Sequence, residues 1–319
     1  MNRFTKDEIR KLTMPGAFAH ITLVNIALEK VRKISPELFP KEVIKALTYN
    51  FKFCELGAVS PDYPYLDISN KNSAPWADAM HYTRSGEMIY AGIDYIKSMP
   101  DGLPKRKSIA WLLGYVAHMV TDVTIHPIVE LKVGPYKENK TAHRRCEMHQ
   151  DSYIFARINL GEIGVSEHVE SICKCGKDGV IDSAVSLIWS EMFNKVHAEA
   201  FITNPPKIES WHKAFDLMVN KIAEEGYQLL PLARHVAVDC GLTYPKFSEI
   251  DYQYIRDLKT PNGPMHCNDI FDFAVDNVVN IWAIIARAIV LNDVEYQHKV
   301  GNWDFDTGRD QDEKLVFWV

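Results

Sequence analysis

Apolar residues recur at three- and four-residue intervals along most of this chain, and strand-like alternation of apolar and polar residues is scarce. Spacing of this kind places the apolar side chains on one face of a helix. We therefore predict an all-α fold built from many helices. The intervals with helical spacing are 6–12, 17–34, 40–56, 76–98, 106–126, 138–158, 165–173, 180–202, 206–229 and 268–292.

Proline and small polar residues indicate where the predicted helices begin and how the chain is organised. Pro40 and Pro206 stand at first-turn positions. The segment GAVSPDYPYLDISNKNSAP at 57–75 predicts a loop, and four prolines at 231–267 predict an irregular, packed connection. We predict an extension at 1–13, a helical domain at 14–230, and a C-terminal helical addition at 231–319 that packs on it.

One predicted core helix, WLLGYVAHMVTDVTIHPIVE at 111–130, carries His118, Asp122 and His126 at intervals of four residues. Four residues advance a helix by roughly 40° beyond one full turn, so His118 and Asp122 face the same side. Pro127 disfavours helical geometry at residue 126 and removes a backbone donor. We expect the helix to bend or end there, which would direct His126 toward a different metal ion from His118.

Further potential ligands accompany that helix, including a second pair at four-residue spacing, His143 and Glu147. Imidazole and carboxylate groups together suit zinc. A single buried histidine is more often a hydrogen-bonded core residue, and an isolated pair is evenly balanced between the two roles. Burying this many ionisable groups without a cation would cost several kcal/mol each, which favours a multi-metal cluster. The candidate ligands are His20, Asp62, His81, His118, Asp122, His126, His143 and Glu147.

The order of these residues resembles the zinc-dependent phospholipase C family, which is related in fold to the fungal single-strand nucleases. The resemblance covers about residues 14–155, where MPGAFAH stands at 14–20 and the pattern His-x-x-x-Asp-x-x-x-His-Pro at 118–127. It implies an all-α protein that holds three zinc ions in a cleft. In the secreted members the histidine after the aspartate lies six residues on, whereas here it lies four residues on.

The resemblance also implies a role for each candidate ligand. The first zinc would be held by Asp62, His81, His118 and Asp122. The second zinc would be held by His126, His143 and Glu147. Asp122 would bridge to a third zinc that His20 completes.

The same resemblance implies roles beside the metals. Asp62 would also accept a proton from the attacking water, as base catalysis requires. Tyr63 follows it directly, and the tyrosine at that place lines the headgroup pocket of choline-preferring members. An ordinary packing role for Tyr63 is the alternative.

Three hypotheses for function follow. The first is a zinc hydrolase that cleaves glycerophospholipids, with peripheral membrane contact. The second is a single-strand nuclease, which would need aromatic platforms and a basic track. Arg144 and Arg145 flank ligands on one helix and form no track, and the formal charge of −6 disfavours nucleic acid. The third is a metal-binding interaction protein without turnover.

The composition adds expectations about location. The N-terminal residues are charged and show no apolar signal segment, and IWAIIARAIVL is short and contains Arg287. The six cysteines form no zinc-ribbon pattern. We therefore expect a cytoplasmic chain without a transmembrane segment, and export by a route that uses no signal peptide stays open.

The beginning of the working chain raises a further question. In the secreted members, the terminal amine and carbonyl of the mature chain hold the third zinc in part. Here nineteen residues precede His20, and Met14-Pro15-Gly16 stands just before it. One hypothesis is that the working chain starts at Pro15, whose amine would join His20 and Asp122. The alternative is an ordinary helical cap at 1–13, with Thr5 as its N-cap.

Overall fold

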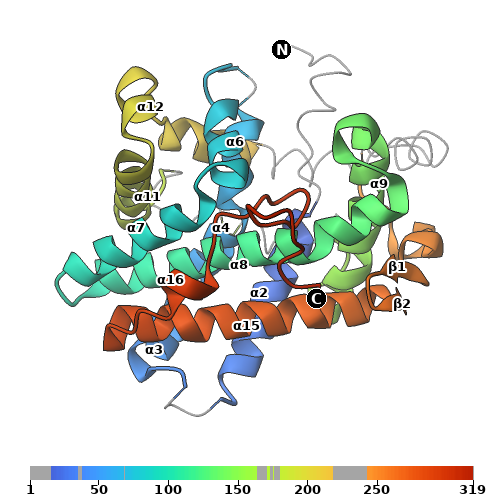
Figure 1. The fold of residues 1–319 in the computed structure, drawn as a ribbon, viewed down its shortest axis with the longest axis horizontal. Coiled ribbons are helices and arrows are strands. Elements are labelled where there is room, and N and C mark those ends of the chain that lie inside the picture. The colour runs from blue at the N-terminus through green and yellow to red at the C-terminus, as the bar shows by residue number, and fades with distance from the viewer. Residues whose placement is uncertain are drawn as a thin grey trace.

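The computed structural model describes residues 16–34, 38–67, 69–163, 171–172, 175, 180–217 and 243–318. Within these ranges the regular structure is helical, apart from a small hairpin (Figure 1). Its two antiparallel strands are β1 (Leu258–Thr260) and β2 (Gly263–Met265). The predicted all-α class is confirmed.

The helices follow the chain from the N-terminal part of the described structure to its end. They are α2 (Ala17–Val31), α3 (Lys41–Tyr49), α4 (Phe51–Val59), α5 (Tyr63–Leu66), α6 (Ala74–Tyr82), α7 (Ser85–Ser98), α8 (Leu103–Val133), α9 (Tyr136–Phe155), α11 (Ser183–Val196), α12 (Ala198–Thr203), α15 (Cys267–Leu291) and α16 (Tyr296–Lys299). Short 3₁₀ turns include η1 (Ser60–Asp62) and η2 (Ala156–Ile158).

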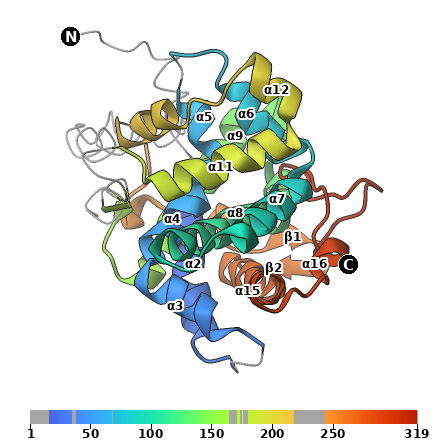
Figure 2. The ribbon, with the colours of Figure 1, turned by 90° about the vertical axis from the view of Figure 1, so that its left-hand side faces the viewer.

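Helix α8 is the centre of the fold, and other helices surround it (Figure 2). Its closest neighbour is α4, and two glycines explain the short separation. A Cβ atom at Gly57 would lie 2.1 Å from the carbonyl oxygen of Trp111, and one at Gly114 would lie 1.9 Å from that of Cys54. Only residues without a side chain permit this contact. The close packing places the C-terminal end of α4, and the η1 turn that follows it, beside the polar stripe of α8.

Helix α15 packs against α8 and α2, so the C-terminal region shares their core. The indole nitrogen of Trp282 donates to the carbonyl oxygen of Leu113 at 2.7 Å. After α16 the chain continues without long helices through residues 300–318, and this C-terminal segment lies in front of α8 (Figure 1). The predicted boundary at residue 230 falls outside the described residues, so the division into domains stays a prediction.

Several predicted boundaries are wrong. The interval 40–56 forms two helices that are interrupted at Asn50, where φ is −128°. The interval 76–98 is interrupted after Tyr82, and Arg84 adopts a left-handed conformation with φ of 55°. Much of the predicted loop at 57–75 is helical, since Pro61 and Pro64 occupy first turns, which tolerate proline.

Pro127 does not end α8, which continues to Val133. The proline has no N–H, so the carbonyl oxygen of Val123 loses its partner within the helix. The C-terminal segment covers this position, because a Cβ atom at Gly308 would lie 2.3 Å from Cγ of Pro127 and 2.4 Å from that oxygen. Tertiary packing of the C-terminal segment on Pro127 therefore supports a continuous helix where local preference would interrupt it.

Two of the described helices, α8 and α15, are long and apolar enough to cross a membrane by length and composition. In their most apolar windows, 94% and 61% of the residues are buried inside the molecule. Core helices of water-soluble proteins have the same properties, so this observation is weak support for a membrane span.

Candidate metal centre

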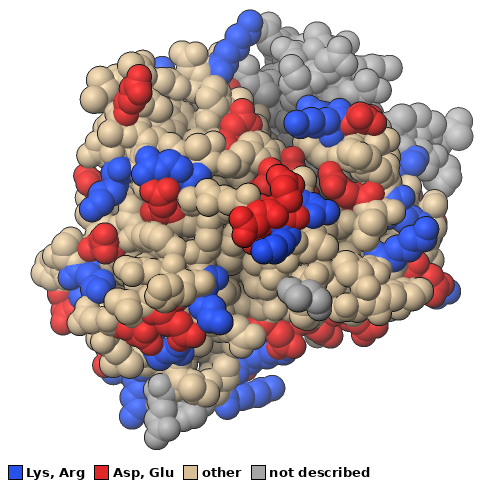
Figure 3. Space-filling view, viewed as in Figure 1, with Lys and Arg blue, Asp and Glu red and all other residues tan. Residues whose placement is uncertain are grey.

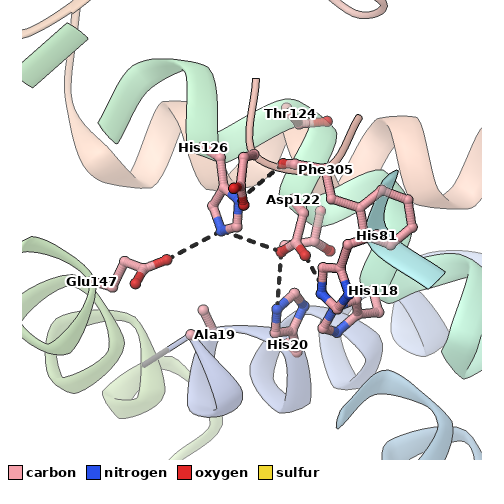
Figure 4. A network of polar contacts seen from close by, with 12 residues as sticks. Ala19, His20, His81, His118, Asp122, Thr124, His126, Glu147 and Phe305 are labelled. Atoms are coloured by element: carbon pink, nitrogen blue, oxygen red, sulfur yellow. Dashed lines mark hydrogen bonds and ion pairs between the residues drawn. The ribbon is translucent and has the colours of Figure 1, made fainter. Parts of the chain in front are cut away.

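The eight candidate ligands come from five elements that meet around the middle of α8. Helix α8 contributes His118, Asp122 and His126, and α2 contributes His20. The η1 turn contributes Asp62, α6 contributes His81, and α9 contributes the remaining two. Figure 4 shows six of these side chains pointing toward one another, with Asp122 in the middle.

Asp122 connects three histidines. Its Oδ1 lies 3.1 Å from Nε2 of His20, and its Oδ2 lies 3.0 Å from Nε2 of His118. Nε2 of His126 lies 3.5 Å from Oδ1. The Asp122 side chain is only 4% exposed. The Asp122 carboxylate therefore lies between the imidazole rings of His20, His118 and His126.

Two sets of ligand atoms include His118. One consists of His20, His118 and Asp122, and the other of Asp62, His81 and His118. In the set that contains Asp62, Oδ1 of this residue lies 3.2 Å from Nε2 of His81 and 3.9 Å from Nε2 of His118. Within each set the ligand atoms lie within 4.8 Å of one another, close enough to share one ion. We call Asp62, His81, His118 and Asp122 the first group.

His126 belongs to a different set, which we call the second group. Its Nε2 lies 3.1 Å from Oε1 of Glu147, and Nε2 of His143 lies 3.3 Å from the same oxygen. These three ligand atoms also lie within 4.8 Å of one another. The one-turn spacing of His143 and Glu147 thus brings α9 to the metal centre, opposite the end of α8 that carries His126.

Hydrogen bonds on the far side of three imidazole rings determine which nitrogen faces the centre. Nδ1 of His81 donates to the carbonyl oxygen of Ala77 at 2.8 Å, and Nδ1 of His118 donates to that of Ala58 at 2.8 Å. Nδ1 of His126 donates to the carbonyl oxygen of Phe305 at 2.9 Å. A carbonyl oxygen can only accept, so in each neutral ring Nε2 carries a lone pair.

The inward-facing atoms therefore form an array of acceptors. Nε2 of His118 faces a carboxylate oxygen at 3.0 Å, and it faces Nε2 of His81 at 3.4 Å. Acceptors this close repel each other unless a proton or a cation lies between them. Outward Nδ1–H bonds with inward Nε2 lone pairs are the usual arrangement of metal-bound histidines. The donor set fits divalent metal ions.

The electrostatics of the centre keep its carboxylates ionised. Burial alone would raise their pKa values, but the positive charge and hydrogen bonds that the neighbouring imidazoles supply when they are protonated outweigh it. His118 is the strongest of these influences on Asp62 and Asp122, and it holds the pKa of Asp122 well below the usual value. His143 and His126 lower the pKa of Glu147 to about 2. A preformed set of anionic oxygens thus faces the imidazoles.

The exposed fraction of the side chains differs across the metal centre and shows which part of it is open to solvent. The side chains of His118 and Asp122 are 1% and 4% exposed, whereas those of Asp62 and His126 are 18% and 15% exposed. Tyr65, Tyr82 and Tyr136 lie around this more open part. Burial and nearby carboxylates raise the pKa of all three, that of Tyr136 to about 12. Their hydroxyl groups are therefore protonated at neutral pH.

Residues 19–199, more than half of the chain, match the sequence model of the zinc dependent phospholipase C family. The chain belongs to this family. No curated protein and no solved structure gives a significant match.

Family membership confirms the resemblance and supports a zinc hydrolase. The match reaches residue 199, further than the expected end near 155, and it includes all eight candidate ligands. It ends long before the C-terminal segment that contacts His126. The zinc phospholipase C match therefore covers the ligands but not everything that surrounds them.

The structure places Tyr63 away from the open part of the centre, in contrast to its expected contact with a headgroup. Its ring is fully buried and stacks on Phe215 with ring centroids 4.4 Å apart. The short helix α5 begins at Tyr63 and directs this ring into the core beside Trp189. Tyr65 and Tyr82, which the sequence reasoning missed, lie near His81 instead.

The sequence reasoning also missed Phe305 and Asp306. The carboxylate of Asp306 accepts a hydrogen bond from Tyr82 at 2.8 Å and lies 4.0 Å from Nδ1 of His126. No periodic pattern connects these residues with ligands about 180 positions earlier. The only available signal was the acidic run DFDTGRDQDE at 304–313.

The proposed start at Pro15 and the alternative cap at 1–13 lie outside the described residues. Gly16 begins the described chain, and its N–H donates to Asp151 at 2.9 Å, while the N–H of Ala19 donates to the other oxygen at 2.8 Å. Asp151 thus holds the first turn of α2 against α9. A Cβ atom at Gly16 would lie 3.6 Å from Nε2 of His20, so the chain enters α2 beside this ligand atom.

Proposed function

We propose that this chain is a zinc-dependent phospholipase C that hydrolyses glycerophospholipids, releasing diacylglycerol and a phosphorylated headgroup. The observation that carries the proposal is the convergence of eight imidazole and carboxylate side chains on one centre in a member of this family. The family match supports the zinc chemistry, and the open edge of the centre supports access for a substrate.

The first group and the second group would each hold one zinc ion. Asp122 contacts histidines of both groups and His20, so it is the residue suited to bridge. His20 with Asp122 and His118 could complete a third site. Two or three ions are consistent with this arrangement.

Bound zinc would polarise the phosphoryl oxygens and stabilise the charge that develops on them. Asp62 would accept the proton of the attacking water, because it is the most exposed carboxylate of the first group. The neighbouring imidazoles lower the pKa of Asp62 against the effect of burial, so this carboxylate is ionised at neutral pH and ready to accept.

Tyr136, at the open edge, would help to orient the substrate. The hydroxyl of Tyr136 stays protonated and can donate a hydrogen bond to a phosphoryl oxygen, whereas the single proton of the Tyr82 hydroxyl is donated to Asp306. The ring of Tyr136 lies 4.9 Å from that of His143, which places it beside the second group. Tyr82 is the last residue of α6.

Electrostatics favour a phospholipid over a nucleic acid strand. The chain carries a formal charge of −6, and acidic residues gather over the C-terminal segment (Figure 3). Asp62 and Asp306 add negative charge at the open edge. A polyanionic strand needs a basic track along its length, whereas one headgroup phosphate can be held by the metals alone.

The test combines metal analysis with hydrolysis assays on the purified full-length protein. We expect zinc to co-purify, and phosphatidylcholine in mixed micelles to be cleaved faster than single-stranded DNA or a chromogenic phosphodiester. Asp62→Asn should bind zinc but lose most turnover. Faster cleavage of DNA, with steep weakening by salt, would favour a nuclease. Zinc without turnover on any substrate would favour a binding protein.

Where the chain acts stays a prediction. The cytoplasmic placement and peripheral membrane contact depend on the sequence arguments alone. Activity on vesicles compared with micelles would show whether a membrane surface assists substrate binding.

A further inference from the structure

The C-terminal segment, residues 300–318, reaches the metal centre through Phe305, although it lies outside the family match. The N–H of Phe305 donates to the carbonyl oxygen of His81 at 3.1 Å. Its carbonyl oxygen accepts from Nδ1 of His126 at 2.9 Å. Its ring lies 5.0 Å from the ring of His81. One residue thus contacts a ligand of the first group and a ligand of the second group.

Asp306 extends the same connection. One carboxylate oxygen accepts from the hydroxyl of Tyr82, which directly follows His81 on α6. The other oxygen lies 4.0 Å from Nδ1 of His126 on α8. The side chain is only 20% exposed, so solvent screens its charge incompletely. Asp306 therefore adds negative charge directly behind the imidazole of His126.

The segment is anchored on both sides of this dipeptide. Before it, the N–H of Trp303 donates to the hydroxyl of Ser85 at 2.8 Å. After it, Gly308 packs on Pro127 with a φ of 64°. The indole nitrogen of Trp318 donates to the carbonyl oxygen of Thr124 at 2.7 Å. The position of Phe305 is thus determined by contacts at α7 and at two places on α8.

We propose that Phe305 and Asp306 are positioning residues that orient His126 and fix the distance between the two groups. This inference rests on the proposed function, since it takes His81 and His126 as metal ligands. The Phe305 carbonyl directs Nε2 of His126 toward Glu147. The Asp306 carboxylate makes the ring more basic and therefore a stronger ligand. The hydroxyl of Tyr82 holds that carboxylate in place.

The two groups should respond differently when this support is removed. Nδ1 of His118 in the first group donates to the carbonyl oxygen of Ala58 on α4, and the C-terminal segment meets this ring through the uncharged ring of Phe305, with centroids 6.1 Å apart. Loss of the Asp306 charge should therefore weaken metal binding in the second group alone. Removal of a group that orients a ligand commonly lowers metal affinity about 10- to 100-fold.

The test measures metal binding to the full-length apoprotein of wild type, Asp306→Asn and Tyr82→Phe. Asp312→Asn is the matched control, because it removes the same charge from the same segment at a side chain that is 74% exposed. Zinc affinity is measured by competition with a chromophoric chelator. The visible spectrum of the cobalt(II)-substituted protein reports the geometry of the ligands.

We expect Asp306→Asn to weaken one class of site about 10- to 100-fold and to change the cobalt spectrum, while the other class keeps its affinity. Tyr82→Phe should produce a smaller loss in the same class, and the variant should fold normally because Tyr82 is 42% exposed and keeps its ring. Asp306→Glu should restore part of the affinity. Asp312→Asn should match the wild type.

Wild-type affinities and spectra in both Asp306→Asn and Tyr82→Phe would overturn the inference and leave the proposed function intact. An equal loss in Asp312→Asn would overturn it too, because the effect would then be one of net charge. If the wild-type protein binds no zinc, both the proposed function and this inference are wrong.

Discussion

His118 and His126 lie one turn before and one turn after Asp122 on the same helix, yet they are supported by different parts of the molecule. The Nδ1 of His118 donates to Ala58, within the region that matches the family. The Nδ1 of His126 donates to Phe305, from a segment 179 residues away. His118 is 1% exposed and His126 is 15% exposed.

The difference indicates that the first group and the second group depend on different parts of the protein for their support. Carbonyl oxygens of the helical body hold the Nδ1 atoms of His81 and His118 in the first group, and the close approach of α4 and α8 at their glycines positions the one that holds His118. The second group also needs the C-terminal segment to be in place. We therefore expect changes in that segment to affect His126 and to leave His118 largely unaffected.

The most damaging change should be at Asp122, which contacts histidines of both groups. Asp122→Asn replaces a charged ligand by a weaker, neutral one and removes the contact to three histidines. We expect turnover to fall by about 1,000-fold or more, and zinc content to fall in both groups. Steady-state assays and elemental analysis of the purified variant measure the two effects. Wild-type turnover in this variant would show that the centre is not catalytic.

Removal of zinc should proceed in two steps. The second group offers three ligands and the first group four, so a chelator should extract the ion of the second group at a lower concentration than the ion of the first group. Binding at 100 times the dissociation constant stabilises a folded protein by about 2.7 kcal/mol, so the fully stripped protein should melt at a lower temperature. A chelator titration followed by calorimetry measures both. Release of all zinc in a single step would show that the two groups do not differ.

A change in the C-terminal segment should have a moderate effect confined to one side. In Gly308→Ala, the new Cβ atom would collide with Pro127 and with the carbonyl oxygen of Val123, at a residue with positive φ. We expect stability to fall by about 1–3 kcal/mol and zinc binding to weaken in the second group only. Gly161→Ala is the control, because its φ is also positive at 88° but its Cβ position is open.

These two variants can be compared by thermal unfolding and by chelator competition. If Gly161→Ala is as harmful as Gly308→Ala, backbone strain alone explains the effect. If Gly308→Ala weakens the first group as well, the two groups depend equally on the segment.

The smallest effect should come from Tyr63→Phe. The ring is buried against Phe215 and keeps its packing in the variant, so we expect a stability change of about 1 kcal/mol and an unchanged KM. The KM for phosphatidylcholine in the variant and in the wild type is the measurement. A several-fold rise in KM without loss of stability would show that Tyr63 reaches the substrate after all.

The parts of this molecule that the sequence predicted well depend on local geometry. The turn spacing of His118 with Asp122, and of His143 with Glu147, is a property of any helix, so these pairs were predictable without knowledge of the fold. The hydrophobic spacing predicted α2, α9 and α15 to within a few residues, and it predicted α8 except for its last turns, from Pro127 to Val133. The zinc phospholipase C resemblance then connected these pairs to one centre.

The parts that the sequence did not predict depend on contacts between distant segments. The break at Arg84 depends on a non-glycine residue with positive φ, whose side chain bonds to Glu87 and to the carbonyl oxygen of Val196. The burial of Tyr63 depends on a partner 152 residues away, Phe215. Phe305 contacts His81 and His126 through its backbone N–H and carbonyl oxygen, which every residue type except proline has, so the sequence does not reveal this role.

The central claim is that the two groups each hold a zinc ion, with Asp122 in contact with histidines of both groups. Anomalous diffraction at the zinc absorption edge, from crystals of the full-length protein, tests it most directly. The account predicts one peak bound by Nε2 of His118 and another bound by Nε2 of His126, each at about 2.0–2.1 Å. An absence of anomalous density among these side chains, in crystals grown with zinc, would contradict it.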